Sequence, residues 1–404
     1  MDQYIRENLG VILKVSERCN LVCDYCYFFF HGDETHRDHP PIIRPALVDD
    51  LCAFIRSAAS EHGVRTVRIG LHGGEPLLLK KARFREVCSK LKGLEDEGLR
   101  IELVVQTNGT LIDADWIDIF AQFDIHLGVS FDGPQAENDR HRFKKNGKGS
   151  YADARRGWEL LQAAHADRRI ALPGLLCVID PEQDGRAVYR HFVDELKSRS
   201  MGFIFPDYTW DTVPAGNHVE KLERYLAAVF EEWTRDGDFK IRVRHIRSML
   251  GALLLDSAAS FQHRFADDVR NLITVSSNGA LGPEDVIRTI SPRFREAGYR
   301  LPQHSLTDLT SGPIWTELEK ARTDPAEKCR QCEWWGMCGG GRPWNRFSEA
   351  NGFRNPSVYC SALRRLYSDA AEYLVANGLP RSEMLRRRDQ GRFVDQEKTG
   401  ADAC

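Results

Sequence analysis

The chain has 404 residues, of which 42% are hydrophobic and 28% are charged, and its formal net charge is -3. This composition is that of a folded globular protein, with room for one αβ barrel and a smaller module. The charge balance argues against a nucleic-acid partner, and the lack of a long apolar stretch or signal peptide predicts a cytoplasmic protein without a membrane partner.

Short apolar runs alternate with longer amphipathic stretches between Gly10 and Tyr208. This alternation predicts six strands, at 11–16, 66–72, 101–107, 125–131, 170–179 and 201–205. Helical patterns lie at 45–61, 80–93, 113–122, 150–166 and 185–198. Such βα units are typical of a parallel sheet. The predicted fold class is therefore α/β, with a partial (β/α)6 barrel of the TIM type whose chemistry lies where strands end.

The remaining chain reads as three further parts. Helical patterns at 218–235 and 244–256 form a bridge, and the sequence after them is rich in Gly, Pro and Cys. A small module with little core is often held together by metal. The predicted domains are a barrel over 1–210, a helical bridge over 211–260, a cluster-binding domain over 261–378 and a polar, mobile tail over 379–404.

The chain has 11 cysteines, and seven of them are clustered. In a reducing compartment, clustered cysteines are better interpreted as metal ligands than as disulfides. The clustered ones are Cys19, Cys23, Cys26, Cys329, Cys332, Cys338 and Cys360. Isolated cysteines are usually small core residues, which is the interpretation for Cys52, Cys88 and Cys177, while Cys404 falls in the tail.

The first cluster places three thiols on one loop directly after the first predicted strand, at Cys19, Cys23 and Cys26. A four-iron cluster normally takes four thiolates, so three leave one iron open to another ligand. Zinc is the alternative, although structural zinc needs a fourth ligand, for which His31 and His36 are the nearby candidates.

The spacing C-x3-C-x2-C, followed by the aromatic Tyr27, resembles the signature of the radical S-adenosylmethionine (SAM) superfamily. This resemblance implies a 4Fe-4S cluster on the three cysteines, with SAM bound at its open iron. It also implies a 5'-deoxyadenosyl radical that takes hydrogen from an unactivated carbon, while the protein supplies positioning and excludes water.

The resemblance continues along the barrel. Gly73, Gly74, Glu75 and Pro76 resemble the GGEP motif that meets the methionine ammonium, where glycine lets the main chain approach closely. Gln106, Thr107, Asn108 and Ser130 resemble family positions around the ribose and the methionine end of SAM. In a D-x-x-R segment that begins at Asp139, Arg142 suits the methionine carboxylate. Val178 is a candidate for the adenine pocket, and Tyr25 is also assigned to the cofactor.

The second cluster offers four thiolates, Cys329, Cys332, Cys338 and Cys360, and resembles the SPASM domain of peptide-modifying radical enzymes. That family uses seven cysteines for two auxiliary clusters, but here Glu284 and Arg342 stand at two ligand positions. We therefore expect a single auxiliary 4Fe-4S cluster, with zinc as the alternative. The SPASM resemblance also implies a role for Asp285, which stands where these enzymes often carry an acid near the substrate and is therefore expected to act as a catalytic base.

The stretch NGFRNPSVYC resembles peptide maturases that form cyclophanes by linking an aromatic ring carbon to a side-chain β-carbon. The implied partners are a ribosomally made precursor peptide and an electron donor such as flavodoxin or ferredoxin. Only 18 residues precede Cys19, so leader recognition is expected from the body of the chain or from a separate leader-binding protein. The alternatives are a sulfatase maturase that makes formylglycine and a non-enzymatic iron-sulfur or zinc sensor.

Overall fold

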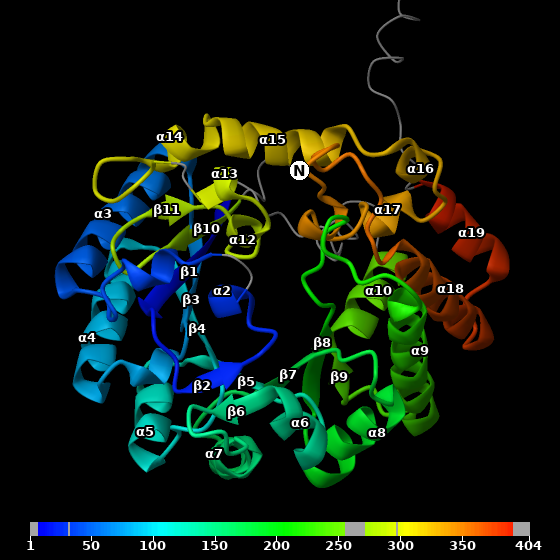
Figure 1. Cartoon of the computed structure of the whole chain (residues 1–404), viewed down its shortest axis with the longest axis horizontal. Helices are drawn as coiled ribbons and strands as arrows, with labels where there is room; N and C mark the ends of the chain where they lie inside the picture. Colours follow the sequence, from blue (N-terminus) through cyan, green and yellow to red (C-terminus); the bar gives the residue numbers. More distant parts are fainter. Residues whose placement is uncertain (1–6, 31–32, 255–270, 296–297, 391–404) are drawn as a thin grey trace, which may run out of the picture. The chain divides into compact units, whose positions relative to one another are not determined.

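The computed structural model describes residues 7–30, 33–254, 271–295 and 298–390 (Figure 1). Within these residues the main sheet has nine strands, in the order β11-β10-β1-β3-β4-β5-β7-β8-β9. Its central six strands run parallel and correspond to the six predicted from the sequence. They are β1 (Asn8–Ser16), β3 (Thr66–Gly73), β4 (Arg100–Thr107), β5 (His126–Ser130), β7 (Gly174–Val178) and β8 (Ser200–Ile204). The predicted α/β class and partial barrel are confirmed.

Three short strands extend this sheet, and two more form a separate ladder. Strand β10 (Leu272–Val275) pairs in parallel with the outer side of β1, and β11 (Leu281–Gly282) adds to it in antiparallel. Strand β9 (Arg242–Val243) pairs in parallel with the outer edge of β8. Strands β2 (Leu21–Cys23) and β6 (Arg142–Lys144) pair with each other in antiparallel. Each of these five strands has four residues or fewer, which is too few for an alternating apolar pattern to be recognised in the sequence.

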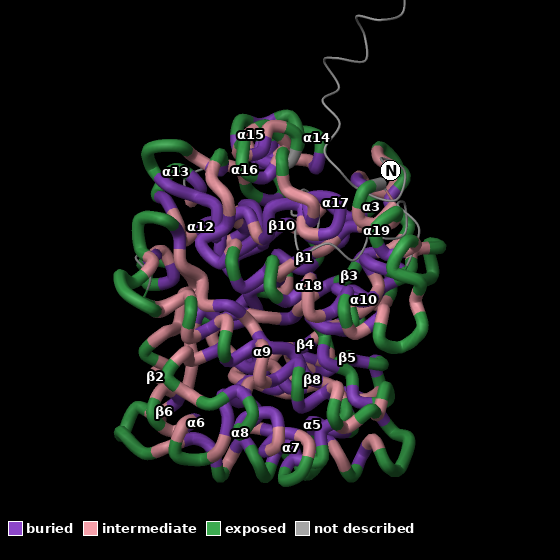
Figure 2. The backbone as a smooth tube through the Cα atoms, turned by 90° about the vertical axis from the view of Figure 1, so that its right-hand side faces the viewer, coloured by how far each residue is buried: buried purple, intermediate pink, exposed green. Residues whose placement is uncertain are grey.

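Four predicted helices of the barrel form close to their expected bounds: α3 (Pro45–His62), α4 (Lys81–Lys92), α5 (Ala114–Gln122) and α7 (Tyr151–Ala166). The predicted helix 185–198 is shorter, because α8 (Gly185–Arg190) gives way to a π-helix over His191–Glu195. Helix α3 begins with Pro45 at its first turn and ends where Gly63 adopts a φ of 72°. In Figure 1, α3, α4, α5 and α7 lie outside the strands. Figure 2 shows the strands mostly buried, as expected for a sheet covered by helices.

The later helices are α9 (His218–Asp236), α10 (Arg244–Leu254), α15 (Pro313–Thr323), α18 (Cys360–Ala376) and α19 (Arg381–Gln390). Short helices precede or lie between them: α2 (Tyr27–Phe30), α6 (Gln135–His141), α12 (Ile287–Ile290), α13 (Pro292–Arg295), α14 (Leu306–Thr310), α16 (Glu327–Arg330) and α17 (Trp335–Cys338). No helix in the described part of the chain is long and apolar enough to cross a membrane.

The chain divides into two compact units. The first holds residues 1–207, 228–244 and 268–318, and the second holds 208–227, 245–267 and 319–404. The predicted domain boundaries at 210, 260 and 378 stay predictions, since compact units and functional domains need not coincide. The predicted mobile tail begins with α19, where Glu383 pairs with Arg386 and Arg387, and residues 391–404 lie outside the described residues.

Candidate active site

The first cysteine cluster lies on the loop that follows β1. Cys23 ends β2, and the amide of Cys26 donates to the carbonyl of Cys23 at 3.1 Å, which closes a tight turn before α2. Burial raises the pKa of the Cys19 thiol to about 12 and that of Cys23 to about 11. Without a metal these thiols are therefore protonated, and binding a metal would release their protons.

The β2-β6 ladder brings Arg142 to the cysteine loop, because its register pairs Cys23 directly with Arg142. The guanidinium donates to the Tyr25 hydroxyl at 2.6 Å, and that hydroxyl donates to the carboxylate of Asp132. Asp132 also accepts the main-chain N–H of Val178 at 3.1 Å. Three predicted cofactor residues therefore meet at Asp132, which follows the end of β5 and which the sequence analysis missed.

Main-chain packing within the protein leaves no room for a side chain at the two glycines of the predicted GGEP motif. A Cβ on Gly73 would lie 1.9 Å from the carbonyl oxygen of Ser16, and one on Gly74 would lie 2.4 Å from that of Arg18. The close approach lets Gly74 N–H donate to Ser16 at 2.9 Å and Glu75 N–H donate to Arg18 at 2.8 Å. The end of β3 is thus fastened to the start of the cysteine loop, which explains these glycines without any ligand.

Glu75 is fully buried and joins the ends of β3 and β4. Its carboxylate accepts the Thr107 hydroxyl at 2.7 Å, the Asn108 amide at 2.8 Å and the Leu77 amide at 3.0 Å. Burial nevertheless raises its pKa. A buried carboxylate of this kind suits a neighbouring cation, as expected for a residue near the SAM ammonium.

Polar residues at the ends of β4 and β5 also converge. The side-chain amide of Gln106 donates to the Ser130 hydroxyl at 2.9 Å. Asn108 donates to the Asn20 side chain at 2.9 Å and to the Cys19 sulfur at 3.8 Å, and Asn20 donates to Thr110 at 2.8 Å. In contrast, Asp139 accepts the Tyr151 amide at 2.8 Å at the start of α7, which is a structural role.

Asp285 lies in a buried network with Lys14, Tyr27 and His72. Its carboxylate accepts from the Lys14 ammonium and, at 2.5 Å, from the Tyr27 hydroxyl. Lys14 is the register partner of His72 across β1 and β3, and its ammonium donates to His72 Nδ1 at 3.2 Å. Lys14 is 1% exposed. A lysine inside the apolar run VILKVS was the signal that the sequence analysis missed.

The protonation states in this network are set by burial and by Lys14. Although burial alone would raise it, the pKa of Asp285 is held well below its usual range by Lys14, with His72 and Tyr27 adding to the effect. Burial and the same ammonium lower the pKa of His72 to about 4. At neutral pH the Asp285 carboxylate is therefore ionised and the His72 imidazole is neutral.

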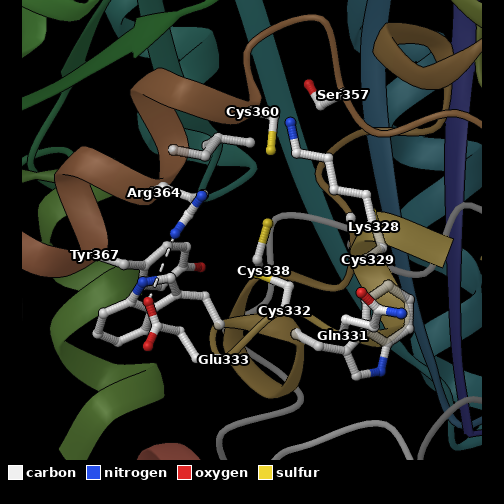
Figure 3. A pocket seen from close by; sticks show the side chains of 14 residues that line it. Lys328, Cys329, Gln331, Cys332, Glu333, Cys338, Ser357, Cys360, Arg364 and Tyr367 are labelled. Carbon is white, nitrogen blue, oxygen red and sulfur yellow. Dashed lines mark ion pairs between the residues drawn. The ribbon is translucent and has the colours of Figure 1, made fainter. Parts of the chain in front are cut away.

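The four later cysteines line a cavity of about 380 Å³ within the second unit (Figure 3). Cys329 comes from α16, Cys338 ends α17 and Cys360 begins α18. Burial raises the pKa of Cys329 to about 11 and that of Cys338 to about 12. Figure 3 shows the thiols of Cys338 and Cys360 pointing into the same space. The rings of Trp334 and Tyr367, which also line the cavity, stack on each other.

A buried cation lies beside these thiols. Arg346, in the short 3-10 helix Trp344–Arg346, is 2% exposed, and its Nη2 has no hydrogen-bond partner. Burial lowers its pKa, whereas Cys329 and Cys338 act in the opposite direction. A buried guanidinium whose Nη2 has no hydrogen-bond partner, with Cys329 and Cys338 favouring its charged form, fits a nearby anionic metal centre.

No group of three or more His, Cys, Asp or Glu side chains in the described residues is arranged to hold a single metal ion. Of the proposed fourth zinc ligands, His36 packs edge-on against Phe29, and His31 lies outside the described residues.

Two predicted auxiliary-cluster positions that lack cysteine have structural roles. The Glu284 carboxylate accepts the amide of Val286 at 2.9 Å at the start of α12. The Arg342 guanidinium lies 4.9 Å from the centroid of the Trp344 ring. Neither position is free for metal binding without loss of these contacts.

Comparison with known proteins gives consistent results. A model of the radical SAM superfamily matches residues 13–182. A serine-type anaerobic sulfatase-maturating enzyme from Klebsiella aerogenes is 32% identical over 369 residues, covering 89% of this chain and 84% of the relative. An uncharacterized protein from a Synechocystis strain is 26% identical and covers 88% of both chains.

Two solved structures share the fold. One is native anSMEcpe with bound AdoMet, with a TM-score of 0.75, 21% identity and coverage of 92% of this chain and 100% of the other. The other is Streptococcus suis SuiB bound to precursor peptide SuiA, with a TM-score of 0.57, 16% identity and coverage of 87% of this chain and 76% of SuiB. At these identities the likeness extends to the fold alone.

Proposed function

Because the chain belongs to the radical SAM superfamily, whose members use a 4Fe-4S cluster and SAM, we propose that this enzyme modifies a ribosomally made peptide by forming a cyclophane crosslink. The observation that carries the radical chemistry is the meeting of the cysteine loop with polar strand ends on one parallel sheet. Cys23, Arg142, Tyr25, Asp132 and Val178 form one connected group there.

Each part of the site has a role in this proposal. Cys19, Cys23 and Cys26 hold the cluster, and Glu75, Gln106, Ser130 and Arg142 surround SAM. When bound, the cluster and SAM supply a deoxyadenosyl radical that removes one hydrogen atom from the substrate. The chain fixes the position of the reacting carbon and excludes water.

Asp132 gives a direct test of the SAM pocket. Asp132→Asn removes a buried charge that accepts from Tyr25 and Val178, so SAM binding should weaken by about 10- to 100-fold, as for loss of a charged hydrogen bond of about 1.5–3 kcal/mol. Isothermal titration calorimetry of the anaerobically reconstituted protein measures the affinity for SAM. Asp118→Asn, which breaks an exposed ion pair with Arg169, is the matched control and should bind normally. Equal affinities would refute the assignment.

The cyclophane product is favoured by a single auxiliary site. Four thiols line one cavity, whereas Glu284 and Arg342 are engaged in structural contacts. Forming the crosslink removes two hydrogens from the peptide: the deoxyadenosyl radical would take one as an atom, and the other would leave as a proton, with its electron passing to an iron-sulfur cluster of the enzyme. We propose Asp285 as the proton acceptor, since it is ionised at neutral pH. It is a weak base, which suffices because an oxidised ring intermediate is strongly acidic.

A sulfatase maturase is the second candidate, favoured by the relative at 32% identity. A serine-derived formylglycine also lacks two hydrogens, so mass alone does not separate the two products. The enzyme is therefore co-expressed with the small peptide encoded next to its gene. A crosslink suppresses fragmentation between the joined residues and does not react with a hydrazide probe, whereas formylglycine reacts. An aldehyde-reactive product would replace the cyclophane assignment.

A sensor function is separated from both by iron, sulfide and deoxyadenosine analysis. The reduced, reconstituted enzyme should release 5'-deoxyadenosine from SAM, and Cys26→Ala should abolish the release. An intact, reduced cluster that forms no deoxyadenosine would sink the enzyme proposal. The electron donor and a separate leader-binding protein stay predictions.

A further inference from the structure

The strongest unexplained feature of the second unit is the buried guanidinium of Arg346. Its Nε donates to the Asn355 carbonyl at 3.2 Å, and Asn355 donates back to the Arg346 carbonyl at 2.9 Å. These two hydrogen bonds hold the backbone of Arg346 and its side chain as far as Nε. They leave Nη2 buried and without a hydrogen-bond partner, although an arginine is always charged in a protein. An uncompensated buried cation would cost several kcal/mol.

The surroundings indicate what compensates the charge. Burial lowers the pKa of Arg346, and Cys329 and Cys338 raise it, so thiolates at these two positions would favour the charged guanidinium. Gly340, on the cavity wall, has a φ of 88°, and a Cβ there would lie 3.3 Å from Nη1 of Arg346. A glycine is therefore placed where a side chain would press on the guanidinium. The residue is held next to the thiols on the protein side, away from solvent.

We propose that Arg346 donates a hydrogen bond from Nη2 to the auxiliary iron-sulfur cluster and raises its reduction potential. This inference rests on the proposed function, in that it needs an iron-sulfur cluster on the four cysteines. Such a cluster carries a net negative charge that grows by one on reduction. A buried cation and a hydrogen bond to sulfur both stabilise the reduced form, since charge and hydrogen bonding to sulfur set cluster potentials. Arg346 is thus a positioning residue that tunes the cluster.

The cavity also supplies a matched control. Arg364 lines the same cavity, but its side chain is 53% exposed and lies 3.7 Å from Glu333. Solvent screens an exposed charge, so its effect on the cluster should be small. Comparing Arg346→Gln with Arg364→Gln therefore removes one positive charge in each case, from a buried side chain in the first and from an exposed one in the second.

The experiment is an anaerobic redox titration of the full chain followed by electron paramagnetic resonance. Cys19, Cys23 and Cys26 are replaced by alanine so that only the auxiliary cluster contributes. Arg346→Gln should shift the potential to more negative values, and Arg364→Gln should leave it near that of the parent. Arg346→Lys should fall between them, because it keeps the charge but loses the planar fork.

Each outcome decides a separate point. A potential in Arg346→Gln equal to that of Arg364→Gln overturns the inference. If Arg346→Gln binds no iron while Arg346→Lys does, charge compensation is supported. If neither binds iron although both show the native circular dichroism, the guanidinium shape rather than its charge holds the site, and the redox role is wrong. Absence of iron in the parent instead contradicts the auxiliary cluster of the proposed function.

Discussion

At the scale of single residues, the site is built from pairs that are distant in sequence. Lys14 and Asp285 form a buried ion pair across 271 positions, and no periodicity or motif near either residue indicates the other. The sequence identified Asp285 by family resemblance, but its partner only becomes visible when β11 and α12 bring the carboxylate to the end of β1. Polar residues at strand ends, in contrast, could be predicted, because parallel strands all end at one edge.

Lys14→Met should destabilise the protein by about 3–5 kcal/mol at neutral pH, as expected when one partner of a buried ion pair is removed. Asp285 contributes this stability above its unfolded pKa, and the contribution is lost as pH falls toward its lower folded pKa. The difference between Lys14→Met and the parent should therefore shrink on acidification. Urea unfolding followed by circular dichroism measures this.

The double variant Lys14→Met with Asp285→Asn should recover most of that loss, because no unpaired charge remains. Lys14→Arg is the conservative control. Equal stability of Lys14→Met and the parent at neutral pH would show that the pair is not buried in solution.

At the scale of elements, the six long strands could be predicted to within a few residues, because apolar periodicity encodes them. The predicted fifth strand, 170–179, shortens to Gly174–Val178, and Pro173 directly before it has no N–H to donate to a ladder. The short β2-β6 ladder could not be predicted, since its pairing depends on the tertiary position of the cysteine loop. Yet this ladder places Arg142 beside Cys23.

Gly74→Ala tests how β3 is fastened to that loop. The added Cβ would clash with the main chain at Arg18 and disrupt two hydrogen bonds, so we expect a loss of at least about 2 kcal/mol in unfolding free energy and poor iron uptake. Gly93→Ala is the control, because nothing lies within 4 Å of its Cβ position and its φ is -58°. It should be neutral or stabilising by about 0.4–1 kcal/mol. Similar behaviour of the two variants would contradict this role.

At the scale of the whole molecule, the two units differ in what holds their cysteines. The loop of the first cysteines is anchored to a sheet by main-chain hydrogen bonds, whereas the later cysteines lie around a cavity, on or beside the short helices α16 and α17 and at the start of the longer helix α18. The sequence predicted two cysteine sites but could not show this difference, which depends on packing.

Removing the second cluster should therefore loosen its own unit. Cys360→Ala is expected to increase hydrogen exchange across residues 329–360, while strands β3 and β4 keep their protection. Cys23→Ala should leave both regions protected. Mass spectrometry of exchanged peptides provides the measurement, and uniform loss of protection in both variants would argue that iron stabilises the chain globally.

The order of strands has a further consequence for biosynthesis. β1 lies between β3 and β10, so its outer edge stays unpaired until the ribosome has delivered residues 272–275. Until then, the outer edge of β1 has no neighbouring strand, and Lys14 lacks its partner Asp285. A nascent protein in that condition is open to association with other chains, so its expression should respond to chaperones that shield strand edges.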